Sequence, residues 1–466
     1  MRKHVGYDLV YKTTTTPFFP ICLIGHNYGR NFRQLAGVKA KSQEVKVVVS
    51  QGAVNWFFPR SLKRIGIKVI DNLINQQSFF LRLTNKEKLL ARKLLDAIKT
   101  PPAVLFTKRS LNDRGAKLIN EIFNLYKEYG YYVDVPGFLF QLYYTPVLKD
   151  KLYKEWKNLS VIEKEKLFNL LLSSPQQTNY ERFLVALMQN KVLNSLAIRK
   201  IAKQFYWLVH DYIGDIVNEK YIKKQIIEMR DDSDDFVLQI KNMQRRIKDI
   251  KFITQRLEPS LRVKVVRIHQ ILWLYNERKK EVINQVNIFI RKLLEYRLNN
   301  LNLSQLHDLY QLKPAEIIDL LRGKKIINIK QRNMAWIYDM VDGQIVDGEK
   351  KFLSLVHIEK TNVLNGLSAS PGRLSGRVCV ILNISHIPNF RKGDILVAPF
   401  TNVNYLPIMR HAKAIITESG GITSHAAIIS RELNKPCIVG IKNLISILRD
   451  KDKVLVDANK GIVKKL

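Results

Sequence analysis

The stretch that most restricts how this chain can fold is 417–440, which reads TESGGITSHAAIISRELNKPCIVG. An apolar, extended run at 412–417 leads into it and favours a strand. Gly420 and Gly421 follow, and a glycine pair allows backbone conformations that are closed to other residues. The next run has helical propensity, and Pro436 ends it because proline lacks an N–H donor. The pattern predicts a strand, a tight turn, a helix and a second strand.

A histidine stands where this helix should begin. Thr423 and Ser424 are residue types that cap helix N-termini, so His425 is expected at the first turn. Free N–H groups and the positive end of the helix dipole favour an anion there. A neutral imidazole is a good nucleophile near pH 7, and the small Gly421 and Ala426 leave room for an in-line donor. These features favour a histidine that accepts a phosphoryl group over one that only caps the helix.

Short β-type runs surround this stretch and indicate a compact C-terminal α/β domain at 366–466. Gly and Pro at 365–372 mark its start, and 351–365 are expected to form a linker. About 100 residues suffice for a separate core. The predicted strands are 376–382, 394–398, 412–417, 437–441 and 453–457.

The segment 146–350 is expected to form a helical domain with long antiparallel helices. Apolar residues recur there at spacings of three and four, which buries one helix face against a neighbour. The short connection around Pro259 favours antiparallel pairing of the two longest helices. The most regular stripe comprises Phe236, Ile240, Met243, Ile247 and Ile250.

Residues 1–145 are interpreted as a mixed α/β region of unknown role. Apolar runs predict strands at 45–49 and 103–106, and an amphipathic pattern predicts a helix over 110–129. Gly25 and Gly29 are not followed by a GK[ST] signature, so they are expected to form a turn rather than a nucleotide-binding loop.

Charge is the most unusual global property. The chain has 77 Lys and Arg against 41 Asp and Glu, a formal net charge of +36. Such an excess attracts polyanions such as RNA. Basic residues are, however, spread along the whole chain rather than clustered with aromatic ones, which favours a coding bias.

The cysteine and histidine patterns argue against a disulfide-stabilised protein and a metalloprotein. Three distant cysteines form no CxxC pair, which excludes a disulfide scaffold and favours a reducing, cytoplasmic location. His210, His269 and His307 are scattered without metal-ligand spacing, so no metal site is predicted. The longest N-terminal apolar run is too short to span a bilayer, so no membrane partner is expected.

The 417–440 stretch closely resembles the mobile phosphohistidine, or swivelling, domain of phosphoenolpyruvate-utilising enzymes. That family includes phosphoenolpyruvate synthase, pyruvate phosphate dikinase and rifampicin phosphotransferase. A second, weaker resemblance to the rifampicin phosphotransferase-like members reaches back to about 260, around 277–279 and Arg332. The matching residues are Gly420, Gly421, Thr423, Ser424, His425, Ala426, Ala427, Arg431, Glu432, Pro436 and Gly440, with Ser368–Arg373, Gly376–Val378 and Lys392–Val397 upstream.

The resemblance implies a fold and a carrier role. The fold is a C-terminal swivelling β/β/α domain behind a largely helical region, with 351–365 as its hinge. His425 is the implied phosphoryl acceptor and the catalytic residue. Val403 and Asn404 depart from the family's usual loop residues. The implied phosphate-stabilising residues are Gly420, Gly421, Thr423, Ser424, Thr401 and Arg431, and Thr423 also occupies a position phosphorylated in plant dikinases.

The family's other modules are not recognised in this sequence. Its members usually carry an ATP-grasp module with glycine-rich loops, and some carry a phosphoenolpyruvate barrel after the mobile domain. The resemblance therefore implies a phosphotransferase component that depends on an ATP-grasp-type partner. ATP or phosphoenolpyruvate is the implied donor, Mg²⁺ is implied through the partner, and the acceptor is an unknown small molecule.

Two alternatives stay open at this point. The swivelling domain could serve as a non-catalytic binding or regulatory scaffold, and the net charge could mark an RNA-associated protein. The intact histidine loop favours the carrier over the scaffold, and the dispersed charge weakens the RNA interpretation. A helix that begins at His425, and a route to its ring, are what the carrier interpretation requires.

Overall fold

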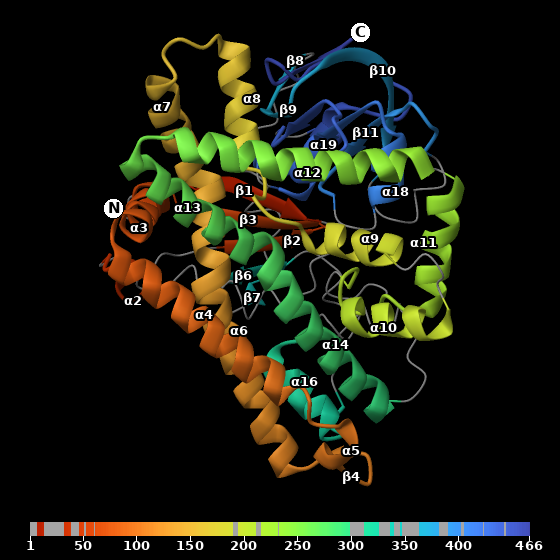
Figure 1. Cartoon of the computed structure of the whole chain (residues 1–466). Helices are drawn as coiled ribbons and strands as arrows, with labels where there is room; N and C mark the ends of the chain where they lie inside the picture. The colour runs from red at the N-terminus through yellow and green to blue at the C-terminus, as the bar shows by residue number, and fades with distance from the viewer. Residues whose placement is uncertain are drawn as a thin grey trace.

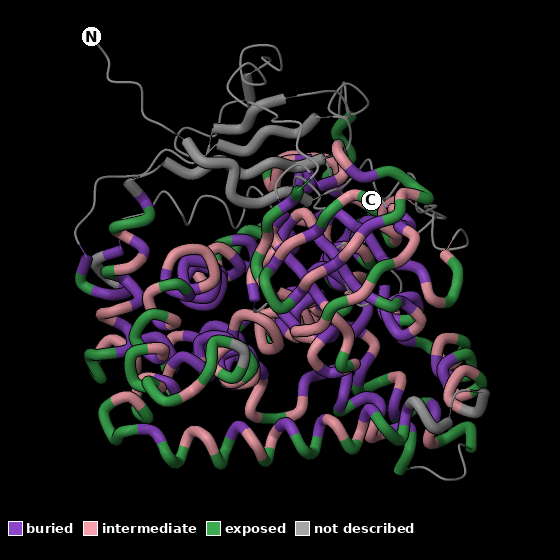
Figure 2. The backbone as a smooth tube through the Cα atoms, turned by 90° about the horizontal axis from the view of Figure 1, so that it is seen from above, coloured by how far each residue is buried: buried purple, intermediate pink, exposed green. Residues whose placement is uncertain are grey.

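The computed structural model combines a helical body, a small N-terminal sheet and a C-terminal sheet domain (Figure 1). Buried residues gather along the C-terminal sheet and on the inward sides of the helices (Figure 2). In the described part, no helix is long and apolar enough to cross a membrane. The structure describes residues 7–13, 32–38, 46–50, 53–59, 61–189, 194–210, 216–231, 233–298, 312–325, 336–339, 345–346, 363–381, 390–401, 405–422, 424–441 and 444–466.

The N-terminal sheet has five strands in the order β1-β3-β2-β6-β7 and is antiparallel throughout. It joins the start of the chain to strands about 300 residues later. The predicted strand at 45–49 is confirmed by β2. The strands are β1 (Tyr7–Thr13), β2 (Lys46–Ser50), β3 (Ala53–Pro59), β6 (Trp336–Asp339) and β7 (Ile345–Val346).

The helical body supplies most of the core. Its helices are α2 (Arg33–Ala36), α3 (Ser61–Asn75), α4 (Gln77–Ala97), α5 (Pro102–Leu105), α6 (Asp113–Leu139), α7 (Thr145–Glu155), α8 (Val161–Leu171), α9 (Asn179–Gln189), α10 (Ser195–Phe205), α11 (Glu219–Asp231), α12 (Ser233–Arg256), α13 (Pro259–Trp273), α14 (Lys279–Leu298) and α16 (Pro314–Leu321), with π-helical turns η2 (Phe140–Tyr144) and η3 (Leu274–Arg278).

The predicted strand at 103–106 is wrong. Residues 102–105 form α5, and only Phe106 extends into β4 (Phe106–Thr107), which pairs with β5 (Ser110–Leu111). Pro102 stands at the start of α5, where its fixed φ is preorganised for a helix. A four-residue apolar run is too short for periodicity to separate strand from helix.

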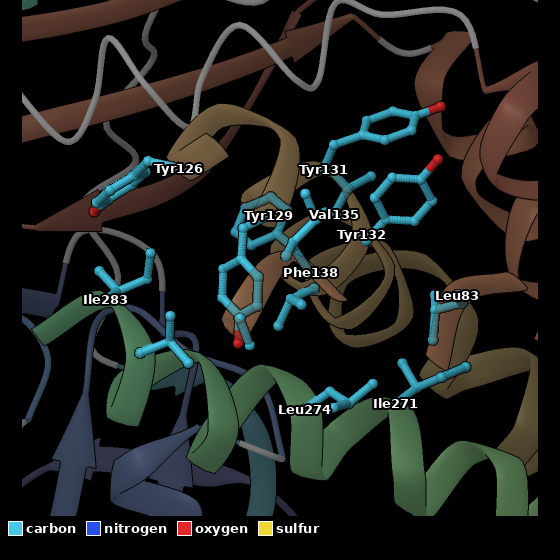
Figure 3. Packing of buried hydrophobic residues seen from close by; sticks show 14 of the residues in the cluster. Leu83, Tyr126, Tyr129, Tyr131, Tyr132, Val135, Phe138, Ile271, Leu274 and Ile283 are labelled. Atoms are coloured by element: carbon cyan, nitrogen blue, oxygen red, sulfur yellow. The ribbon is translucent and has the colours of Figure 1, made fainter. Parts of the chain in front are cut away.

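The helix predicted over 110–129 is present but longer, because α6 continues through Pro136 to Leu139. Asn112 caps it by accepting a hydrogen bond from the Gly115 N–H at 2.7 Å. A Cβ on Gly137 would lie 2.2 Å from the Cβ of Tyr275, so this glycine lets α6 and η3 approach closely. Tyrosine and aliphatic side chains from α6, α4, η3 and α14 fill the surrounding core (Figure 3).

Helix α12 lies across α9 and α19 (His425–Glu432) (Figure 1). Of its predicted apolar stripe, Phe236, Met243 and Ile250 are buried. The same face also buries two polar residues, Gln239 and Arg246. This face of α12 therefore makes polar contacts with the C-terminal domain, which the apolar stripe alone does not predict.

The C-terminal sheet has eight strands in the order β8-β15-β14-β10-β11-β12-β13-β9. Strands β10 to β13 run parallel, and the flanking pairs are antiparallel. All the predicted strands are present, with ends shifted by a few residues. The elements are β8 (Val363–Asn365), β9 (Leu367–Ser370), β10 (Arg373–Val380), β11 (Ile395–Ala398), α18 (Leu406–His411), β12 (Ala414–Thr417), α19, β13 (Cys437–Val439), α20 (Leu444–Ile447), β14 (Lys453–Asp457) and β15 (Ile462–Lys465).

The linker expected at 351–365 falls mostly outside the described residues, and its last three residues form the edge strand β8. One apolar cluster runs without a break from the helical body into the C-terminal domain. It joins Phe183 of α9 and Ile288 of α14 to Met409 and Ala427. In this structure the C-terminal segment is therefore packed against the helices.

Candidate functional site

The loop between β12 and α19 requires glycine at one of its two glycine positions. Gly420 has a φ of +115°, which side-chain-bearing residues rarely adopt, and a Cβ there would lie 2.8 Å from Ser424 Oγ. Gly421 is different, because a Cβ added there would lie 3.7 Å from its nearest neighbours, which are atoms of Gln141 in η2. Gly420 therefore shapes the loop, whereas Gly421 brings the loop against the helical body.

Helix α19 begins at His425, as the sequence predicted. Ser424 occupies the N-cap position with extended backbone, but its hydroxyl makes no capping hydrogen bond. That buried Oγ has no partner among the described residues. Thr423 lies outside the described residues, so its expected role in stabilising phosphate stays a prediction. The helix start and the N-cap position of Ser424 are both confirmed, although the Ser424 hydroxyl does not bond a backbone N–H of the helix.

Thr401 and His425 are brought together from segments 24 residues apart. The hydroxyl Oγ1 of Thr401 lies 2.9 Å from Nδ1 of His425. Thr401 is buried just beyond β11, and the described residues give Nε2 of the ring no hydrogen-bond partner. The contact orients the imidazole, and Nε2 carries the lone pair when Nδ1–H donates to the Thr401 hydroxyl.

His425 lines a small cavity between the C-terminal domain and the helical body. The cavity has a volume of about 40 Å³. The residue as a whole is half-buried. The other lining residues are Thr178, Asn179, Tyr180, Trp207, Leu208, Asn276, Glu277, Lys280, Leu406, Ile428 and Ile429.

The π-helical turn η3 carries Glu277 to this cavity. A π-turn inside a long helix shifts the direction of the residues it carries and is common at functional sites. Glu277 Oε2 accepts a hydrogen bond from the Asn179 N–H at 2.7 Å, and Asn179 Nδ2 donates to the Glu277 carbonyl at 3.0 Å. Burial raises the pKa of the Glu277 carboxyl, although nearby Lys280 opposes the rise. A carboxylate with a raised pKa takes up a proton more readily than an exposed one.

The ionisation of His425 is set by the same surroundings. Burial lowers the pKa of the ring well below its usual value, and the positive charge of Lys280 lowers it further. Both effects disfavour the imidazolium ion. The ring is therefore neutral at physiological pH, which is the state that nucleophilic attack requires.

Arg431 is engaged at the other end of α19. Six residues separate it from His425, about 9 Å along a helix axis. Its Nε donates to Ser173 Oγ at 2.8 Å, and a terminal nitrogen donates to the Ala369 carbonyl at 3.0 Å. Burial lowers the pKa of Arg431 to about 10. Arg431 thus joins α19 to the segment that follows α8 and to β9 of its own sheet. Its predicted contact with phosphate stays a prediction.

Two further arginines fasten the domain, and sequence reasoning missed both. Arg246 of α12 donates to Glu181 and to Glu432, each at 2.8 Å, and all three side chains are buried. Arg410 donates to the Tyr180 hydroxyl at 2.9 Å. For Arg246, the sequence contained one signal: a charged residue stands at a position of α12 where the helical period predicts an apolar one.

The structure offers no metal site in its described residues, since no three His, Cys, Asp or Glu side chains gather there. Arg332 and the 402–404 loop, which the sequence analysis also named, lie outside those residues.

Comparison with known proteins supports the resemblance. Residues 390–461 match the protein family described as PEP-utilising enzyme, mobile domain. Phosphoenolpyruvate synthase from Pyrococcus furiosus is 40% identical over 145 residues, which cover 29% of this chain and 18% of that protein. Rifampicin phosphotransferase from Bacillus cereus is 28% identical over 240 residues, which cover 48% of this chain and 27% of that protein.

Another relative is a probable phosphoenolpyruvate synthase from Methanothermobacter thermautotrophicus, 46% identical over 101 residues, which cover 22% of this chain and 15% of that protein. The chain thus spans less than a third of the length of each of these relatives. Among solved structures, an aconitase X chain from Thermococcus kodakaraensis covers 22% of this chain at 22% identity with a TM-score of 0.19, and 98% of that chain is covered.

Proposed function

We propose that this chain is a phosphoryl carrier in which His425 takes a phosphoryl group from a donor on a partner chain and delivers it to an acceptor held by the helical body. The observation that carries the proposal is the oriented ring of His425, held by Thr401 at Nδ1 and facing a cavity lined by Glu277 and Lys280. Its relatives named above are phosphoenolpyruvate synthases and a rifampicin phosphotransferase, which agrees with phosphoryl transfer.

In the loading step, Nδ1–H donates to Thr401 Oγ1, and the lone pair of Nε2 attacks the phosphorus of the donor. A P–N bond forms as the P–O bond to the leaving group breaks, and the bonding electrons leave on that oxygen. The ring becomes positively charged and the leaving group gains one negative charge. The donor is ATP, bound with Mg²⁺ by an ATP-grasp-type partner, or phosphoenolpyruvate bound by a separate site on a partner chain.

In the delivery step, an acceptor hydroxyl oxygen attacks the phosphorus and the P–Nε2 bond breaks. The bonding electrons return to Nε2, which restores the neutral ring. The hydroxyl proton passes to the Glu277 carboxylate, whose raised pKa suits a proton acceptor. The Lys280 ammonium stabilises the charge that spreads over the phosphoryl oxygens.

The two steps require the C-terminal domain to move. The cavity beside His425 has about 40 Å³, which is room for little more than a water molecule. A nucleotide or phosphoenolpyruvate donor does not fit there. We assign the docked arrangement to the acceptor side because His425 there lines a cavity with Glu277 and Lys280, and loading takes place after the domain has swung away from α9 and α12.

The test is direct labelling of the full chain. Potassium phosphoramidate, a small reagent that phosphorylates histidine nitrogens without a partner, is compared with β- and γ-labelled ATP and with labelled phosphoenolpyruvate. The proposal predicts an acid-labile, base-stable label that mass spectrometry places on His425. His425→Ala loses it, whereas the control His411→Ala keeps it. Label that persists in full in His425→Ala, or the absence of label on His425 in the unchanged chain, would overturn the assignment.

A further inference from the structure

A second, much larger hollow lies between α4 and α14. It has a volume of about 700 Å³, within the range of roughly 300–1,000 Å³ that is typical of small-molecule sites. Helices α4 and α14 pack against each other (Figure 1), and residues of the α4–α5 connection also line the hollow. The walls come from 88–102, from Tyr206 just after α10, and from 278–292.

The lining of this hollow is strongly basic. It includes Lys88, Arg92, Lys99, Arg278 and Lys292, against a single carboxylate, Asp96. Lys99 is paired with Asp96 at 2.7 Å, and Arg278 is paired with both Glu87 and Glu281. Within the described part of the chain, Lys88, Arg92 and Lys292 form no ion pair. All three residues are exposed, and Lys88 and Arg92 also interact with the nearby carboxylates of Glu87 and Asp96. The five cations that line the hollow nevertheless outnumber its one lining carboxylate, and this excess favours an anion.

The same hollow has an apolar floor. Ile288 and Phe289 of α14 are buried beneath it, and Leu95 and Ile98 complete the opposite side. A phosphate or sulfate ion alone would leave this surface in contact with water. Cations at the rim and hydrocarbon below are the pattern expected for a small molecule with one charged end and one apolar body.

The hollow shares a wall with the His425 cavity. Arg278 lines the hollow, while the preceding Glu277 lines the cavity beside the histidine. Likewise Tyr206 lines the hollow and Trp207 lines the cavity. A hydrogen bond of 3.0 Å from the Tyr206 hydroxyl to Gln285 Oε1 joins the two sides of the hollow along this wall.

We propose that this hollow binds the phosphoryl acceptor, and that the acceptor is an anionic small molecule with an apolar body and a hydroxyl group that reaches the His425 cavity past Tyr206. This inference rests on the proposed carrier function. The shared chemistry is one phosphate or carboxylate attached to a hydrocarbon or aromatic frame, with the anion held by Arg92 and Lys292.

The experiment measures binding of 1-naphthyl phosphate and 1-naphthoate to the full chain by titration calorimetry. Both anions are expected to bind, and the tighter one identifies the charged group. Neutral 1-naphthol and inorganic phosphate are expected to bind at least tenfold more weakly, about 1.4 kcal/mol by conversion. The double variant Arg92→Gln/Lys292→Gln is expected to lose about tenfold in affinity for the naphthyl anions. The matched control Lys93→Gln, an exposed position on the same helix outside the hollow, stays within twofold.

The outcomes separate this proposal from the carrier function. His425→Ala is expected to bind the naphthyl anions as the unchanged chain does, so that binding survives even if histidine labelling fails. Absence of binding by both naphthyl anions, equal affinity for 1-naphthol, or an unaffected Arg92→Gln/Lys292→Gln variant would overturn the acceptor site. Displacement by a uridine 20-mer with a steep salt dependence would assign the hollow to RNA instead and also overturn it.

Discussion

The hydroxyl of Thr401 lies 2.9 Å from Nδ1 of His425, so a residue just beyond β11 holds the ring at the start of α19. A threonine hydroxyl can accept or donate a hydrogen bond, and the two choices fix opposite tautomers of the ring. Only when the hydroxyl accepts from Nδ1–H does the lone pair stand on Nε2. The reactivity of His425 therefore depends on the direction of this one hydrogen bond.

Thr401→Val keeps the shape of the side chain but removes this hydrogen bond. A hydrogen bond contributes about 0.5–1.5 kcal/mol, so labelling of His425 by phosphoramidate should slow roughly three- to tenfold. Thr401→Ser restores the hydroxyl and should recover most of the rate. Timed labelling followed by mass spectrometry gives both values. Equal rates for the valine and serine variants would show that the contact does not orient the ring.

The second prediction concerns the ionisation of His425. Its pKa should lie well below the usual value of about 6.5, because burial and Lys280 both disfavour the imidazolium ion. A lowered pKa means that the ring stays neutral until the solution becomes distinctly acidic. Loading should therefore vary little with pH between about 6.5 and 8 and should fall only at lower pH. NMR titration of the ring measures the pKa directly.

Lys280→Met removes the second of these two causes. The pKa of His425 should then rise, though by less than the full shift, because burial is the larger cause. Lys279→Met is the matched control, since Lys279 is paired with Asp134 at 2.6 Å rather than lining the histidine cavity. A pKa of His425 at or above 6.5 in the unchanged chain would contradict the surroundings described for the ring.

The features that the sequence predicted correctly depend on residues that are close together in the chain. The glycine pair and the following run with helical propensity placed the start of α19 at His425, and short apolar runs placed β11, β12 and β14. These signals depend on residues that are close in the chain. The same reasoning failed at 103–106, where two prolines started a helix in an apolar run too short to show a period.

Contacts between distant segments were beyond such reasoning. An apolar stripe on α12 indicates which face is buried, but not what covers it. Arg246 lies 186 residues from Glu432, and nothing local connects them. Likewise, the meeting of Glu277 with His425 depends on how the C-terminal domain docks on η3. The sequence could place His425 at the start of α19, but it could not predict what surrounds the residue.

The third prediction separates the two glycines of the loop. Gly420→Ala forces a side chain into a φ of +115° and against Ser424 Oγ, so the loop should be destabilised by about 1–3 kcal/mol. Gly421→Ala meets no atom closer than 3.7 Å and should stay within about 0.5 kcal/mol of the unchanged chain. Urea unfolding measures both. Equal losses for the two variants would contradict the loop geometry.

The last prediction concerns the buried charges that hold the docked domain. Arg246→Met leaves Glu181 and Glu432 facing each other without their cation, and breaking a buried ion pair in this way costs about 3–5 kcal/mol. Burial, Glu181 and Glu277 raise the pKa of Glu432, whereas the positive charges of Arg246 and Arg431 lower it. The domain should therefore leave α12 more often in Arg246→Met.

Because the docked cavity of about 40 Å³ excludes donors, this undocking should speed the labelling of His425 by phosphoramidate while it slows delivery. Arg245→Met, which removes only an exposed pair with Asp249, should change neither rate. Hydrogen exchange should rise in α12 and α19 of Arg246→Met but not of Arg245→Met. Faster exchange without faster labelling would show that the docked ring is already reached by donors, and the two-position mechanism would then fail.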